Sequence, residues 1–135
     1  MKILVTGGAG FIASHVTDAF LAEGHDVFVL DNLSSGYKEN INPKATFIQA
    51  DICDKGLSEL FEKEKFDSID HHAAQMVVRK SVKDSAFDAT VNILGTINLL
   101  QNAVITCVKK VIFASPGAAI YGEQDYFHAD EKHAK

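Results

Sequence analysis

Cysteine, proline and tryptophan are scarce in this sequence of 135 residues, which contains two cysteines, two prolines and no tryptophan. Cys53 and Cys107 lie far apart and match no metal-binding spacing, so a structural zinc site is not expected. We expect both to be reduced thiols in the core of a cytoplasmic protein, with a disulfide as the alternative.

Basic residues and long apolar runs are scarce as well. The sequence has 13 lysines and arginines against 18 acidic residues, a net charge of −5, and no basic run beyond Lys109-Lys110. This balance argues against a nucleic-acid-binding surface. No apolar run is long enough to cross a membrane, so no membrane partner is expected. The sequence starts directly with an expected strand, which predicts that there is no signal peptide.

Apolar residues are plentiful and make up 47% of the sequence, which supports a packed core and argues against disorder. A chain of this length fits one domain. We assign residues 1–123 to that domain and residues 124–135 to a polar C-terminal tail. The tail contains His128, Asp130, Glu131 and His133, which could bind a stray metal ion. We predict a solvated tail and no metal site, because the cluster lacks a closed ligand set.

A glycine-rich turn near the N-terminus is the most informative local feature. The apolar run at residues 3–5 predicts a buried strand, the run TGGAG at residues 6–10 breaks it, and a helical pattern begins at Phe11. In this context the glycines let the backbone approach a pyrophosphate, which the amide groups and dipole at the helix N-terminus attract. Ala13 is small enough for close contact between helix and strand. The alternative is a plain strand–helix connection.

Acidic residues follow the next two expected strands. Residues 26–30 read DVFVL and end at Asp31, about 20 residues after the glycine turn, where a dinucleotide-binding fold places a carboxylate on ribose hydroxyls. A carboxylate there repels a 2′-phosphate, so NAD is favoured over NADP. The alternative is that Asp31 only opens a turn. Asp51 and Ile52 could contact an adenine ring, with a helix cap as the alternative for Asp51.

Strands and helices alternate along the rest of the sequence. Further strands are expected at residues 45–50, 66–71 and 110–114, and helices at residues 11–23, 57–65 and 84–108. The first helix is expected to bury an apolar face made of Phe11, Ile12, Val16, Ala19, Phe20 and Leu21. The alternation predicts an α/β fold, a Rossmann-type doubly wound parallel sheet of about five strands with the first strand in the centre.

Three polar residues stand in apolar surroundings. His71 and His72 end the fourth strand, and we expect one imidazole to be packed at the strand end and the other to face a loop, with acid–base or metal chemistry as the lesser alternative. Asn92 lies within the long helix and is expected to bond a neighbouring loop. Because that helix is apolar around much of its circumference, a second subunit could cover its outer side.

Six motifs occur in order along nearly the whole sequence: TGGAGFIASH, VLDNLSSG, the acidic DIC turn, HHAAQ, VNILGTINLL and VIFASPGAAIYGE. With these motifs the sequence resembles the N-terminal part of the UDP-glucose 4-epimerases, which belong to the extended short-chain dehydrogenase/reductase family. The resemblance implies a cytoplasmic enzyme of nucleotide-sugar and galactose metabolism. Its cofactor would be NAD and its substrate a nucleotide sugar, with UDP-glucose and UDP-galactose interconverted through a 4-keto intermediate.

The same resemblance implies a cofactor site. The positions that match the family's pyrophosphate, ribose, adenine and nicotinamide-proximal contacts are, in chain order, Gly7, Gly10, Phe11, Ile12, Asp31, Asn32, Ser35, Gly36, Asp51, Ile52, Ala73, Ala74, Gln75, Asn92 and Ser115.

Two departures from the family pattern concern catalysis. Family enzymes use a Tyr base supported by a Lys four residues later, and a Ser or Thr that holds the sugar's 4-oxygen. Pro116 stands at the hydroxyl position and offers no side-chain donor or acceptor. No tyrosine in the sequence is followed four residues later by lysine. We therefore assign no catalytic residue and expect a domain truncated before the catalytic helix and the substrate domain, inactive alone.

Three interpretations remain open at this point. The first is an enzyme, either a sugar-nucleotide epimerase or the NAD-binding part of one whose remainder is a separate chain. The second is a catalytically silent NAD-binding module or truncated gene product acting through oligomerisation. The third is a structural remnant that binds nothing and persists through oligomerisation. The fifth strand would form an exposed edge with Val111, Ile112 and Phe113, and such edges pair with other chains. We therefore expect a homo-oligomer or a complex with a missing C-terminal chain.

Overall fold

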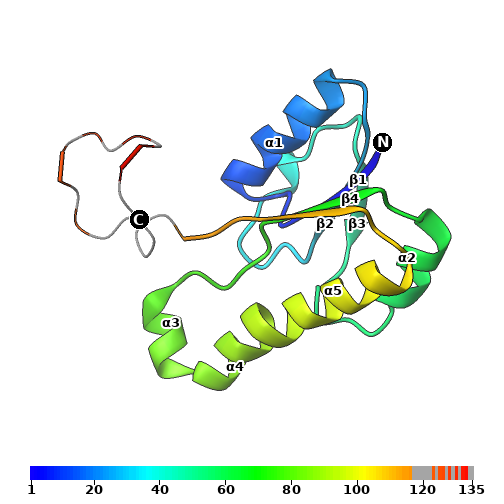
Figure 1. The fold of residues 1–135 in the computed structure, drawn as a ribbon. Coiled ribbons are helices and arrows are strands. Elements are labelled where there is room, and N and C mark those ends of the chain that lie inside the picture. Colours follow the sequence, from blue (N-terminus) through cyan, green and yellow to red (C-terminus); the bar gives the residue numbers. More distant parts are fainter. Residues whose placement is uncertain (117–122, 124, 127, 129, 131, 134–135) are drawn as a thin grey trace.

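The computed structural model describes residues 1–116, 123, 125–126, 128, 130 and 132–133. Its centre is a five-stranded parallel sheet with the order β3-β2-β1-β4-β5 (Figure 1). The strands are β1 (Lys2–Thr6), β2 (Asp26–Asp31), β3 (Thr46–Gln49), β4 (Ser68–His71) and β5 (Lys110–Phe113). This order confirms the predicted Rossmann-type sheet with β1 in the centre. Because all neighbouring strands are parallel and the order reverses at β1, the connecting segments must cross on both faces of the sheet.

Alternate side chains of the strands serve two separate cores. Helix α1 (Phe11–Ala22) covers one face, where Ile3, Val5 and Val27 are buried together with Ala13. Helices α2 (Leu57–Glu64) and α5 (Thr96–Ile105) lie on the other face, over the larger core (Figure 1). Their residues Leu57, Phe61 and Leu99 are fully buried there with side chains of β1, β2 and β4. Both faces are covered because the crossovers of a parallel sheet place helices on its two sides.

The buried side of α1 differs from the predicted one. The residues that are buried are the small ones, Ala13, Ser14 and Thr17. Phe11 and Ile12 are 77% and 65% exposed, so the expected apolar face is wrong at its start. A stripe of small side chains lets the helix axis approach the strands closely, which larger residues on that side would prevent. The small residue expected at position 13 is confirmed in that role.

The long helix expected at residues 84–108 is present but irregular. Helix α4 (Ser85–Ala89), the π-helical turn η2 (Thr90–Gly95) and α5 follow one another without a break and end at Ile105. Asp84 caps the start, where its carboxylate accepts a hydrogen bond of 3.0 Å from the backbone N–H of Phe87. At Gly95 the helix passes so close to Ile52 that an added Cβ would lie 2.8 Å from the Ile52 Cδ1 atom.

Two short elements were not expected from the sequence. Helix α3 (Val78–Lys83) precedes α4, and the 3₁₀ turn η1 (Lys38–Asn40) lies in the connection between β2 and β3. Both lack buried residues, so neither carries the apolar periodicity by which a helix is recognised. In the described part of the chain no helix is both long and apolar enough to cross a membrane.

The surface beyond α5 and β5 is apolar. Strand β5 pairs with β4, and Val111, Ile112 and Phe113 are 36%, 39% and 56% exposed. The outer side of η2 and α5 adds a row of exposed apolar side chains, namely Ile93, Leu94, Ile97, Leu100, Val104 and Ile105.

Both cysteines are free thiols, but Cys107 is exposed at a backbone φ of 59°, so its expected place in the core is wrong.

Candidate functional site

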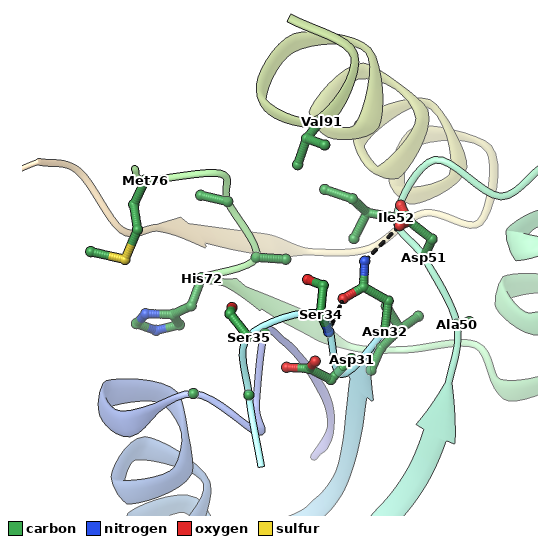
Figure 2. A pocket seen from close by; sticks show the side chains of 16 residues that line it. Asp31, Asn32, Ser34, Ser35, Ala50, Asp51, Ile52, His72, Met76 and Val91 are labelled. Atoms are coloured by element: carbon green, nitrogen blue, oxygen red, sulfur yellow. Dashed lines mark hydrogen bonds between the residues drawn. The ribbon is translucent and has the colours of Figure 1, made fainter. Parts of the chain in front are cut away.

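A pocket lies where the loops that follow β1, β2, β3 and β4 meet, with one further contribution from η2 (Figure 2). This is the carboxyl edge of the sheet, where open parallel sheets place their ligand crevices. Ten of its lining residues were predicted from the sequence: Gly7, Gly10, Asp31, Asn32, Ser35, Gly36, Asp51, Ile52, Ala73 and Ala74. The lining also contains Leu30, Ser34, Ala50, His72, Met76 and Val91.

The glycine turn forms the floor on the side of β1 and α1. Gly7 has a backbone φ of +70°, and its N–H donates to the carbonyl of Leu30 at 2.8 Å. A Cβ added to Gly7 would lie 2.8 Å from the backbone nitrogen of Ala73, so only glycine fits at this contact. Gly10 begins α1 without a side-chain cap, which leaves the first N–H groups of the helix available to an anion.

The carboxylate of Asp31 is fixed by two backbone groups. Its Oδ2 atom accepts a hydrogen bond from the N–H of Ala9 at 3.0 Å, and Oδ1 accepts one from the N–H of Leu33 at 2.7 Å. Asp31 therefore ties the glycine turn to the loop after β2. Each carboxylate oxygen retains a second lone pair for a donor in the pocket, such as a hydroxyl group.

The wall opposite the glycine turn contains Asp51, whose Oδ2 atom accepts a hydrogen bond of 2.7 Å from the side-chain amide of Asn32 (Figure 2). Burial alone would raise the pKa of Asp51, but hydrogen bonds from the Cys53 backbone N–H and from Asn32 outweigh it and lower that pKa. Burial, followed by the neighbouring Asp51 carboxylate, raises the pKa of Cys53 to about 11. Asp51 is therefore charged at neutral pH, while Cys53 is a neutral thiol.

A hydrogen-bonded chain supports the loop after β4. The Thr6 hydroxyl lies 2.7 Å from His71 Nδ1 and accepts a hydrogen bond of 3.2 Å from the N–H of Ala73. His71 Nε2 lies 3.1 Å from the hydroxyl of Thr96 on α5. Burial lowers the pKa of His71 to about 4, helped by the charge of His72. The expected packed imidazole at the strand end is His71, whereas Nε2 of His72 lies 3.1 Å from Asp70 Oδ1 of β4.

Asn92 holds the same loop from η2, as expected. Its side chain accepts a hydrogen bond from the backbone N–H of Gln75 at 2.8 Å and donates one to the Gln75 carbonyl at 2.9 Å. The side chain of Gln75 in turn donates to Asp88 at 2.8 Å. Asn92 and Gln75 therefore do not line the pocket; they support its wall.

Three other predicted site residues also lie outside the lining. The side chains of Phe11 and Ile12 are exposed at the start of α1, so only their backbone N–H groups are candidates for an anion contact. Ser115 follows β5 and is exposed, as is Pro116. The motif residues 117–122 lie outside the described residues. Within the described part of the chain, no group of three or more possible metal ligands occurs.

Six lining residues were missed from the sequence. Ser34 lies inside the loop that was singled out, Leu30 is the last but one residue of β2, and Ala50 directly follows β3, so position alone could have suggested them. His72 was interpreted only as one of a pair of histidines, packed at the strand end or facing a loop, with acid–base or metal chemistry as the lesser alternative. Met76 and Val91 gave no signal, because their approach depends on the course of the loop after β4 and on the irregular helix.

A parallel sheet with this strand order, and a glycine turn that opens onto a pocket at its carboxyl edge, define a Rossmann-type nucleotide-binding domain. Comparison with known proteins gives the family. The chain belongs to the NAD dependent epimerase/dehydratase family, whose model matches residues 3–134.

Named relatives agree with this assignment. The UDP-glucose 4-epimerase of Mycolicibacterium smegmatis is 44% identical over 97% of this chain and 44% of its own length. The crystal structure of the Thermotoga maritima UDP-glucose 4-epimerase with UDP-glucose is 44% identical, with a TM-score of 0.87 over 99% of this chain and 44% of that one. The Thermus thermophilus enzyme in complex with NAD is 43% identical with the same TM-score and coverage. The chain thus spans less than half the length of these relatives.

Proposed function

We propose that this chain is the NAD-binding region of a sugar-nucleotide epimerase similar to the UDP-glucose 4-epimerases. The observation that carries the proposal is the convergence of three features on one pocket: the glycine turn, the fixed Asp31 carboxylate and the Asp51–Asn32 pair. Family membership and the NAD complex of the Thermus thermophilus relative support the same cofactor.

The residues present fit a dinucleotide. Gly7 and Gly10 line the pocket with backbone alone, and the uncapped start of α1 offers N–H groups to a diphosphate. Asp31 can accept hydrogen bonds from ribose hydroxyls, and its charge repels a 2′-phosphate. Asp51 can accept from the adenine amino group, with Ile52 against the ring. NAD, when bound, supplies the hydride acceptor and donor for oxidation and reduction at the sugar's C4.

Calorimetric titration of the chain with NAD, and with NADP as the comparison, tests this proposal. We expect NAD to bind and NADP to bind at least about tenfold more weakly, because one unfavourable charge contact is worth 1 to 2 kcal/mol. Asp31→Asn should reduce this preference. Asp26→Asn, an exposed carboxylate at the other end of β2, is the matched control and should leave it unchanged. Absence of binding, or equal affinity for both dinucleotides, would refute the proposal.

For the reaction of the whole protein, we propose reversible interconversion of UDP-glucose and UDP-galactose through a 4-keto intermediate, in the cytoplasm. The given residues alone should not catalyse it, because Pro116 has no hydroxyl group and no Tyr-x-x-x-Lys occurs. We expect no turnover of UDP-galactose in a coupled assay with NAD present. The alternative proposal is a silent NAD-binding module. It predicts that UDP-galactose is still not turned over when the C-terminal part of a relative, which carries Tyr-x-x-x-Lys, is added as a separate chain.

We further propose that the surface formed by β5 and the outer side of α5 contacts other protein, either a second copy or a C-terminal region like that of the longer relatives. Val111, Ile112 and Phe113 stand at the edge of the sheet with exposed side chains, and exposed strand edges favour pairing. Sedimentation should show a dimer or larger species, reduced by Ile112→Lys. A strict monomer at all concentrations would contradict self-association.

A further inference from the structure

The charged side chains that line the pocket do not balance the negative charge of a diphosphate. Asp31 and Asp51 are acidic, and the lining contains no lysine and no arginine. A diphosphate brings further negative charge. Among the described residues that line the pocket, His72 is the one whose side chain can become positive. Histidine ordinarily changes charge between about pH 5 and 8, so this positive charge depends on pH.

The position of His72 places it beside the proposed diphosphate site. It follows β4 directly, and a Cβ added to Gly7 would lie 2.9 Å from the carbonyl carbon of His72. The His72 backbone therefore touches the glycine turn that precedes α1. In Figure 2 the His72 ring lies on the side of the pocket away from Asp51.

A buried carboxylate stands behind the imidazole. Asp70 is 4% exposed, and its Oδ1 atom lies 3.1 Å from His72 Nε2. That oxygen has no hydrogen bond to any described residue. A buried carboxylate oxygen without a hydrogen-bond partner is unfavourable, and a positive charge on the nearby imidazole would stabilise it by charge attraction. With Nε2 turned to Asp70, the Nδ1 atom, which has no partner in the described part of the chain, is left for a ligand.

We propose that protonated His72 binds the diphosphate of the dinucleotide through Nδ1–H, with Asp70 as the positioning residue, so that NAD binding takes up a proton. This inference rests on the proposed function of the pocket. Protonation and NAD binding then strengthen each other by the same factor, because coupling between two binding events is reciprocal.

The other titratable groups around His72 do not produce the same pH dependence. His71, the neighbour on β4, has its pKa lowered by burial to about 4 and stays neutral near neutral pH. Asp51 has a lowered pKa and stays charged. His72 is therefore the described pocket residue on which the proposed pH dependence rests.

The experiment is calorimetric titration of the chain with NAD and with ADP-ribose from pH 6 to 8, in buffers of different ionisation enthalpy. We expect affinity to rise as the pH falls, with net proton uptake. His72→Gln should lower the affinity for both ligands about tenfold at pH 6 and abolish the proton uptake, because a hydrogen bond to a charged group is lost. Asp70→Asn should shift the pH dependence to lower pH. His25→Gln, at the far end of the sheet, is the matched control.

Three results would overturn the inference. The first is that the unsubstituted chain binds NAD with an affinity that does not change with pH and that His72→Gln binds equally well. This result removes His72 from the site and leaves the proposed function intact. Loss of affinity for NAD but not for ADP-ribose places His72 at the nicotinamide instead of the diphosphate. Absence of NAD binding at every pH overturns the proposed function and this inference together. Circular dichroism of each variant without ligand shows whether it is folded.

Discussion

Replacing Gly7 by alanine tests the geometry of the pocket most directly. The substitution has two separate effects. An L-residue at a φ of +70° costs roughly 1–2 kcal/mol. The new Cβ would also lie 2.8 Å from the nitrogen and 2.9 Å from the Cα of Ala73, which are backbone atoms that cannot rotate away. Forcing such atoms apart costs typically a further 1–3 kcal/mol. We expect the free energy of unfolding to fall by about 2–5 kcal/mol.

Two other glycines provide matched controls. Gly24 has a φ of +78° and no atom within 4 Å of an added Cβ, so Gly24→Ala should lose only the backbone term of roughly 1–2 kcal/mol. Gly56 has neither a positive φ nor a close neighbour, so Gly56→Ala should be neutral or slightly stabilising, by about 0.4–1 kcal/mol. The difference in stability between Gly7→Ala and Gly24→Ala isolates the contact with Ala73.

The assay is urea unfolding followed by circular dichroism, with the slope against urea concentration used to check that the transition is unchanged in extent. The reasoning is refuted if Gly7→Ala is no less stable than Gly24→Ala. If Gly7→Ala folds, its NAD affinity should fall as well, because relief of the contact moves Ala73 and the pocket wall. Gly24→Ala should keep the affinity of the unsubstituted chain.

Three further predictions follow from the loops around the pocket. Asn92→Ala should lower the free energy of unfolding by about 1–3 kcal/mol in urea, because the backbone N–H and C=O of Gln75 both lose a partner; an unchanged midpoint would contradict this. His71 has a folded pKa of about 4, below its ordinary value, so it stays neutral in the folded state while the unfolded chain takes up a proton. Stability should be full above about pH 6.5 and fall by up to about 3 kcal/mol as the pH drops toward 4, and His71→Gln should flatten that profile. Cys107 should react with a thiol reagent at pH 8 much faster than the half-buried Cys53, whose pKa is raised to about 11; equal rates would refute the raised pKa of Cys53.

Much of the fold could be predicted because its signals are local. The strand before Gly7, the glycine turn and the acidic end of β2 can each be recognised from a few adjacent residues. The crossover rule then gives the order of the strands. The amphipathic helix α2 begins at Leu57 as expected and ends one residue earlier.

The rest depends on distances between segments. The buried side of α1 could not be predicted from apolar residues, because close approach to the sheet selects Ala13 and Thr17 over Phe11. The role of His72 required the position of Asp70 and of the glycine turn in space. The support of Gln75 by Asn92 was expected only as a contact with some loop, since the π-helical turn that aims Asn92 leaves no pattern in the sequence.

The π-helical turn at Thr90–Gly95 also sets the helical phase of everything after it. Each residue of an α-helix advances by about 100°, so one residue removed from this turn would restore α-helical winding and rotate α5 by about that angle. Thr96 would then turn away from His71, and Leu99 would leave the core. A change of length is often tolerated at the tip of a loop. Here, deletion of a single residue would turn the buried side of α5 toward solvent and an exposed side toward the core. Residues 90–95 are therefore expected to tolerate substitution better than any change in their number.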